Sequence, residues 1–115
     1  MDLLVKVPDG GTAQLFVTRH DGLADDDFPA NDYVLKFIEP SHALEVYERM
    51  DVSNPAKVRH LVLNMPGGYP VEVPFLEATP EGVVCRNDAH VLKALYELGV
   101  NPIPVVLNYR LAELI

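Results

Sequence analysis

A cysteine, an acid and a histidine follow one another closely in the last third of the chain, as Cys85, Asp88 and His90. A thiolate nucleophile needs a histidine base within hydrogen-bond reach, and a helix N-terminus just after the thiol lowers its pKa. Val83 and Val84 precede the cysteine, however, which is typical of a buried strand where cysteine serves as a small apolar residue. The structural interpretation is favoured, because a single cysteine without a wider signature is weak support for catalysis.

Two adjacent glycines, Gly67 and Gly68, form the sharpest turn signal in the chain. Glycine lets a backbone approach a phosphate or carboxylate closely. This turn lacks the lysine and the spacing of a phosphate-binding loop, so a simple hairpin turn is the leading interpretation. The alternative is a site for an anionic metabolite or nucleotide, formed by the turn, by a helix start at Asn87 and Asp88, and by Arg110.

An acidic loop at residues 20–32 carries Asp25, Asp26 and Asp27 in succession and contains no basic residue. These carboxylates either engage a basic patch on a partner or keep the protein solvated. Tyr69, on the glycine turn, is the tyrosine most expected to be exposed, and tyrosine is enriched at interface hot spots. The three aspartates and Tyr69 are therefore the predicted partner-binding residues.

The four histidines, His20, His42, His60 and His90, do not have the spacing of metal ligands. No two lie one helical turn apart, and the single cysteine has no partner nearby. The acidic loop also lacks the alternating ligands and the glycine of a calcium loop. The sequence therefore predicts no metal site and no cofactor, and it favours a non-enzymatic protein.

The charge and the apolar content together restrict the partners. The 115 residues carry a net charge of −8, which repels nucleic-acid phosphates and anionic lipid headgroups. Hydrophobic residues make up 49%, more than a small interior hides, so we expect an exposed apolar surface and a homo-oligomer. No apolar run is long enough to span a bilayer, and one cysteine allows no internal disulfide; a cytoplasmic setting is predicted.

The elements that would position these residues follow from hydrophobic periodicity and turn residues. Leu3 to Val17 alternate around a Pro-Asp-Gly-Gly turn and predict a hairpin. Further strands are expected at 33–38 (a central strand), 58–65, 71–75, 83–85 and 103–107. The strands at 58–65 and 71–75 would form a second hairpin across the glycine turn, and Pro74 would place the latter at an edge or bulge.

Two helices are predicted. The first starts with Ser41 as its cap and ends before a turn at 51–55. The second is capped by Asn87 or Asp88 and ends at Gly99. The fold class is therefore α+β in a single compact domain, 1–115: a mixed, mostly antiparallel sheet of five to seven strands with two helices packed on one face.

The function predicted from these observations is a small acidic interaction protein, an accessory or inhibitor factor that binds a macromolecular partner as a homo-oligomer. Its supports are the net charge, the apolar excess and the absence of a catalytic signature. The alternative is a protein, or a small enzyme, that binds a small anionic ligand beside the glycine turn and the second helix.

Overall fold

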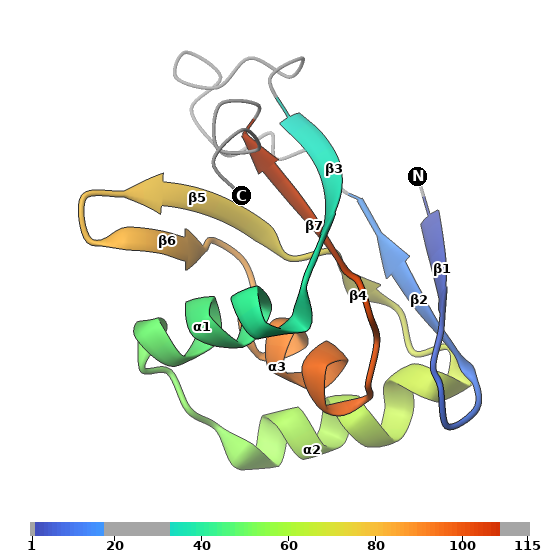
Figure 1. Ribbon diagram of the computed structural model, residues 1–115. Coiled ribbons are helices and arrows are strands. Elements are labelled where there is room, and N and C mark those ends of the chain that lie inside the picture. Colours follow the sequence, from blue (N-terminus) through green and yellow to red (C-terminus); the bar gives the residue numbers. More distant parts are fainter. Residues whose placement is uncertain (1, 18–32, 109–115) are drawn as a thin grey trace.

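The computed structural model describes residues 2–17 and 33–108 (Figure 1). The chain begins with strands β1 (Asp2–Lys6) and β2 (Thr12–Phe16), which pair antiparallel. The turn between them places Gly10 and Gly11 at φ +118° and +91°, in the region that favours glycine. The predicted N-terminal hairpin is confirmed.

The strands form two sheets, where the sequence predicted a single one. β2 lies between β1 and β4 (Val71–Glu72) in a three-stranded sheet. The four-stranded sheet has the order β3-β7-β5-β6, with bounds Tyr33–Ile38, Ile103–Asn108, Phe75–Thr79 and Gly82–Cys85. Three pairings are antiparallel, while β2 with β4 and β5 with β7 are parallel. The α+β class with mixed sheets is confirmed, and the single sheet of five to seven strands is wrong.

The chain crosses from one sheet to the other at Val73 and Pro74, the gap between β4 and β5. The amide of Val73 still donates to Phe16 on β2, at 2.9 Å. The carbonyl of Pro74 already accepts from Val106 on β7, at 2.8 Å. Pro74 thus lies where the ladder is interrupted, as its missing N–H requires.

The inner strands of the larger sheet are β7 and β5, and the prediction that 33–38 is central is wrong. Every side chain from 103 to 107 is buried, whereas β3 lies at the end of the sheet order and exposes Phe37. Apolar residues on both faces of β3 suggested that it is an inner strand. Its position in the sheet is set instead by its pairing with β7, which lies far along the chain, and a local pattern does not show this pairing.

Three α-helices are present in the described residues, where two helices were predicted: α1 (Pro40–Met50), α2 (Pro55–Asn64) and α3 (His90–Glu97). Figure 1 shows them gathered on one side of the molecule. α1 and α3 fall where helices were predicted. Ser41 does not cap α1, because the helix already begins at Pro40 and no side chain caps it. Asp51 ends α1 in a left-handed conformation, and Gly99 follows α3 at φ +78°.

Helix α2 replaces the strand predicted at 58–65. The side chain of Asn54 accepts a hydrogen bond from the amide of Lys57 at 3.2 Å, and Pro55 occupies the first turn, so the segment begins as a capped helix. Val58 and Leu61 are buried one turn apart, while Leu63 is 72% exposed, as a helix of period 3.6 requires. A short apolar run is compatible with a strand or a helix, and the pattern was misassigned.

The second predicted hairpin is consequently absent. A short 3₁₀ helix, η2 (Met65–Gly67), follows α2 directly, and Gly68 adopts φ +96°. The chain then enters β4, whose partner is β2 in parallel. The core between these elements is one cluster, to which both sheets and all three α-helices contribute buried side chains.

Candidate functional site

A shallow groove of about 300 Å³ opens between α2, the turn after η2, and the segment that precedes α3. Its lining combines apolar side chains with a set of polar and aromatic ones. The apolar members are Phe16, Leu61, Pro70, Val71 and Val91, and the others are Lys57, His60, Tyr69, Glu72 and Asp88. This lining includes two of the residues that the sequence singled out, Tyr69 and Asp88.

Helix α2 supplies one wall of the groove. Lys57, His60 and Leu61 are spaced by three and four residues, which places them on the same side of the helix. The buried Leu61 anchors that side to the core, and the two polar side chains reach the solvent-facing part of the wall. Folding of residues 55–64 as a helix is therefore what brings Lys57 and His60 to the groove.

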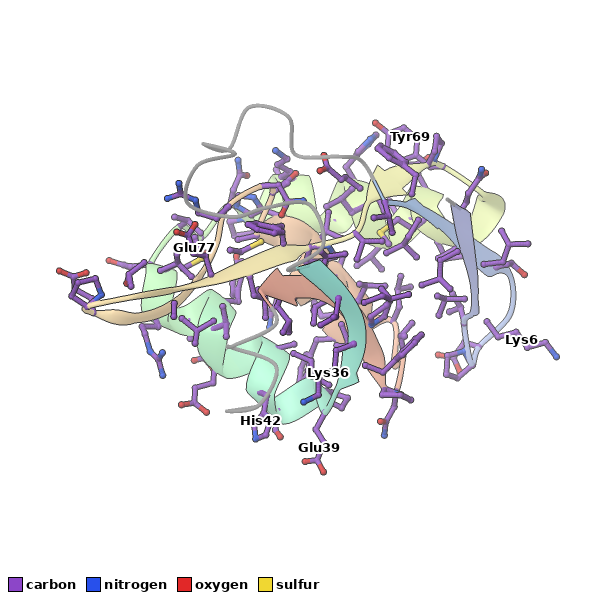
Figure 2. The ribbon with its side chains drawn as sticks, turned by 90° about the horizontal axis from the view of Figure 1, so that it is seen from above. Lys6, Lys36, Glu39, His42, Tyr69 and Glu77 are labelled. Carbon is purple, nitrogen blue, oxygen red and sulfur yellow. The ribbon has the colours of Figure 1, made fainter. Side chains whose placement is uncertain are left out.

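Tyr69 is exposed at the rim, where 46% of its surface is accessible. Its ring meets the His60 ring edge to face, with the centroids 5.4 Å apart. Asn64 holds the histidine, because its Nδ2 donates to the His60 carbonyl at 2.6 Å and lies 3.2 Å from Nδ1. Figure 2 shows Tyr69 at the periphery, on the other side of the molecule from His42.

The glycine turn positions Tyr69. Gly68 takes a left-handed conformation and donates to the Met65 carbonyl at 3.0 Å, after which the Tyr69 amide donates to the Asn64 carbonyl at 3.3 Å. A Cβ atom added at Gly67 or Gly68 would meet nothing within 4 Å, so both glycines border open space. Their predicted role as a ligand-approach loop stays a prediction, and the structure gives them a conformational role at the end of η2.

Asp88 also lines the groove and is held by two other side chains. The Lys57 amine lies 2.9 Å from Oδ2, while the backbone amide and the Nδ1 of His90 lie 3.0 and 2.8 Å from Oδ1. Burial alone would raise the pKa of the carboxyl, but the bonds from Lys57 and His90 outweigh it and hold the pKa below its ordinary value. The groove therefore presents a charged, paired carboxylate.

The other ring nitrogen of His90 joins this cluster to the connection between α1 and α2. Nε2 lies 2.8 Å from the Val52 carbonyl oxygen, and the ring also contacts Tyr47 edge to face. The Asp88 carboxylate and the Val52 carbonyl can only accept hydrogen bonds. The contacts of Nδ1 and Nε2 are therefore both hydrogen bonds at the same time only when each ring nitrogen carries a proton. His90 thus ties Asp88 to the backbone after α1.

Asn87, predicted as a ligand-binding residue, has an internal structural role. Its Oδ1 accepts from the Phe75 amide at 2.9 Å, and its Nδ2 donates to the Val73 carbonyl at 2.9 Å. The thiol of Cys85 also donates to Oδ1, at 3.0 Å. The Asn87 side chain therefore stabilises the segment in which the chain passes from one sheet to the other. Its role in binding a ligand stays a prediction.

Cys85 does not have the environment of a nucleophile. The side chain is buried, and burial raises the pKa of the thiol to about 12; the nearby carboxylates of Asp88 and Glu72 act in the same direction, and hydrogen bonds reduce the effect. The thiol donates to Asn87, while His90 is engaged by Asp88 and Val52. The interpretation of Cys85 as a buried strand residue is supported by this packing.

Several predicted residues lie outside the described part of the chain. These are the acidic loop 20–32 with Asp25, Asp26 and Asp27, and Arg110. Conversely, sequence reasoning missed Lys57, His60 and Glu72. The Asn54-Pro55 pair was the available signal for the first two, because a cap followed by proline indicates a helix start.

Within residues 2–17 and 33–108 no three histidine, cysteine or acidic side chains are grouped so as to hold a metal ion. In the same ranges no helix is long and apolar enough to cross a membrane. Comparison of the chain with protein-family models, with curated proteins and with solved structures found no match. The function is therefore argued from the groove itself.

Proposed function

We propose that the protein is a non-enzymatic interaction protein, an accessory or inhibitor factor that holds a segment of a macromolecular partner in the groove beside Tyr69. One observation carries the proposal: an exposed tyrosine stands at the rim of an apolar groove whose border is polar. Protein interfaces combine a buried apolar centre with a polar rim, and their energetic anchors are enriched in tyrosine. A shallow, open groove suits a chain segment better than an enclosed small molecule.

The states of Cys85 and Asp88 favour binding over catalysis by either of these two side chains. The Cys85 thiol has a raised pKa and is buried, and the Asp88 carboxylate is charged and paired with Lys57. A general acid or base needs a pKa near the working pH. The pKa of the Cys85 thiol is too high and that of the Asp88 carboxyl is too low to meet this requirement. A protein that only binds a partner needs no general acid or base.

The test is capture of partners by the tagged chain and by two tyrosine variants. Tyr69→Ala removes the aromatic side chain at the groove, and Tyr96→Ala is a matched control, since Tyr96 is 37% exposed on α3. We expect a protein from an extract of the source cells to be retained by the wild type and by Tyr96→Ala, and lost with Tyr69→Ala. Equal retention by all three would reject the groove as the binding surface.

Self-association in a cytoplasmic setting remains part of the proposal. Large apolar side chains are exposed on several described elements: Leu4, Phe37, Val52, Leu63, Tyr69 and Tyr96. Exposed apolar groups favour association with a second copy. Light scattering coupled to size exclusion, at several protein concentrations, is expected to give a mass above 12.8 kDa. A mass of one chain at every concentration would remove the homo-oligomer from the proposal.

A small ligand in the same groove is the second candidate. The groove volume lies at the lower end of the range for ligand pockets, and Lys57, His60 and Asp88 converge on it. A ligand that prefers the folded state raises the melting temperature. A panel of nucleotides and anionic metabolites is therefore expected to produce a shift that Tyr69→Ala abolishes, if this candidate is correct; an unchanged melting temperature across the panel would count against it.

A further inference from the structure

We propose that two copies of the chain associate through the outer edge of β1, with their β1 strands antiparallel and centred on Leu4. This inference rests on the self-association that forms part of the proposed function, and it names the surface and the residues that mediate it. The supporting observations are the backbone groups that β1 directs outward, the exposed Leu4, and the opposite charges that one register brings together.

Strand β1 ends the three-stranded sheet. Within residues 2–17 and 33–108 it pairs with β2 and with no other strand. Figure 1 shows β1 at the margin of the molecule. A strand in this position leaves its outward N–H and C=O groups available to a further strand, which a second copy of the chain can supply.

The hydrogen bonds around β1 and β2 show which groups of β1 face outward. The Val7 amide donates to the Gly11 carbonyl at 3.2 Å, which places this pair in the bonded set of the ladder. The Phe16 carbonyl accepts instead from Val73, just after β4, on the side away from β1. Bonded pairs alternate along an antiparallel ladder, so the even-numbered residues of β1 direct their backbone groups away from β2. These residues are Asp2, Leu4 and Lys6.

The side chains of β1 alternate between the core and the solvent. Leu3 and Val5 are partly buried and pack against the core. Leu4, in the middle of the strand, is 69% exposed, and Lys6 is exposed as well. Figure 2 shows Lys6 reaching away from the rest of the molecule. A second β1 strand along this edge would set one Leu4 against the other and cover apolar surface that water otherwise contacts.

One register of the two strands gives both the greatest overlap and opposite charges. When two antiparallel β1 strands are centred on Leu4, Asp2 of each copy lies opposite Lys6 of the other. About six backbone hydrogen bonds then form, because each of the three facing pairs exchanges two. Opposite charges directly across an antiparallel pair are stabilising. A shift by two residues loses a facing pair and sets Leu4 opposite a charged residue.

The charge of the whole chain limits the strength of this association. A net charge of −8 on each copy opposes it. The Debye length at physiological ionic strength is about 8 Å, so the facing pairs at the edge outweigh charges farther away. The contact consists mainly of one short strand from each copy, which is smaller than a standard interface. We therefore expect a weak dimer, with a dissociation constant of roughly micromolar to millimolar magnitude.

Sedimentation equilibrium of the full chain, at concentrations up to about 1 mM, tests the proposal. The wild-type mass is expected to rise with concentration from 12.8 kDa toward that of two chains. Lys6→Asp sets acids opposite acids, and Asp2→Lys sets bases opposite bases. Each is expected to weaken association roughly tenfold or more. Because the two substitutions change the net charge in opposite directions, a loss in both is not an effect of net charge.

Mixing the two variants provides the decisive comparison. A pair with one Lys6→Asp chain and one Asp2→Lys chain again has opposite charges at both facing positions. The mixture is therefore expected to associate about as strongly as the wild type, although neither variant does so alone. Such rescue also shows that both variants fold. Arg59→Asp, on the exposed surface of α2, is the control for a reversed basic charge and is expected to leave association unchanged.

Failure of this inference can be told apart from failure of the proposed function. A dimer that Lys6→Asp and Asp2→Lys leave intact, or a mixture that does not recover association, would overturn the β1 edge and keep self-association through another surface. A wild type with the mass of one chain at every concentration would remove both, and would leave a foreign strand as the occupant of this edge. Capture of a partner that depends on Tyr69 is independent of either result.

Discussion

The Oδ1 of Asn87 accepts a hydrogen bond from the backbone amide of Phe75, 12 residues earlier, at 2.9 Å. The Nδ2 of the same side chain donates to the Val73 carbonyl. One amide side chain thus provides the acceptor and the donor that a neighbouring strand provides in a ladder. It does so at Pro74, where the chain leaves one sheet and enters the other.

Substitution of Asn87 by alanine is expected to destabilise the fold. Asn87→Ala removes the hydrogen bonds that the Asn87 side chain makes with the Phe75 amide and the Val73 carbonyl, and the loss of a hydrogen bond to a buried group costs about 1 to 3 kcal/mol. Partial burial places the expected loss in the free energy of unfolding at about 2 to 4 kcal/mol, measured by urea denaturation.

Asn87→Asp is the control for this prediction. Aspartate keeps the oxygen that accepts from Phe75 but offers no donor to Val73, so an intermediate loss of stability is expected. If Asn87→Ala were as stable as the wild type, the side chain would not hold the crossing. Its predicted role toward a ligand would then become the better explanation for an asparagine at this position.

Gly11 is expected to be intolerant of a side chain for two reasons. Its φ of +91° disfavours other residues, and a Cβ atom there would overlap the backbone carbonyl of Pro66, the middle residue of η2. Gly10 has φ +118° and open space around it. Gly10→Ala is therefore expected to cost about 1 to 3 kcal/mol from backbone strain, and Gly11→Ala clearly more.

Thermal unfolding of both glycine variants measures the difference. The strain of positive φ is common to the two, so the excess loss in Gly11→Ala reports the overlap with Pro66. Equal melting temperatures for the two variants would mean that the β1–β2 turn moves away from η2 at little cost. The packing of the turn against η2 would then contribute little to stability.

The local elements of the fold were predictable where sequence neighbours decide them. The N-terminal hairpin follows from strict alternation around a turn that contains Gly10 and Gly11. Helix α3 follows from its apolar stripe and from Gly99. Helix α2 was missed for two reasons. The apolar run from Leu61 to Leu63 is compatible with the period of a helix and with that of a strand, and the β-branched residues Val58 and Val62 favour a strand.

The site was predictable only in parts, because it is assembled by contacts between distant segments. Tyr69 and Asp88 were chosen for separate reasons, Tyr69 as a partner-binding residue and Asp88 as a ligand-binding residue at the start of the second helix. Lys57 and His60 join them only once residues 55–64 are helical, and Glu72 only once β4 pairs with β2 in parallel. No local sequence pattern predicts that β2 and β4 pair in parallel, so the groove could not be predicted from the sequence.

The lowered pKa of Asp88 predicts a contribution to acid stability. The folded-state pKa lies below the ordinary value, because Lys57 and His90 favour the charged form over the cost of burial. A depressed carboxyl pKa stabilises the fold above the unfolded-state pKa, and this contribution is lost as pH falls through the folded-state pKa. The loss therefore occurs in the acid range, below the ordinary aspartate pKa.

Asp88→Asn is expected to be less stable than the wild type at neutral pH and to converge with it in acid. The difference is up to about 1 kcal/mol, since the pair is partly screened by solvent. Melting temperatures measured from neutral to strongly acidic pH give the comparison. Asp9→Asn, in the exposed β1–β2 turn, controls for the loss of one carboxylate. A constant gap between Asp88→Asn and wild type at every pH would contradict the expected linkage.

Cys85 is expected to resist alkylation in the folded protein. Burial raises the pKa of its thiol from 9.0 to about 12, and the thiolate is the reactive form. At pH 8 about one thiol in ten thousand is then ionised, whereas an ordinary thiol is about a thousandfold more ionised. Iodoacetamide labelling, followed by mass spectrometry, is expected to be roughly a thousandfold slower for the native chain than for the chain unfolded in urea. Comparable rates in the two states would show that Cys85 is an accessible thiolate, and the nucleophile interpretation would have to be restored.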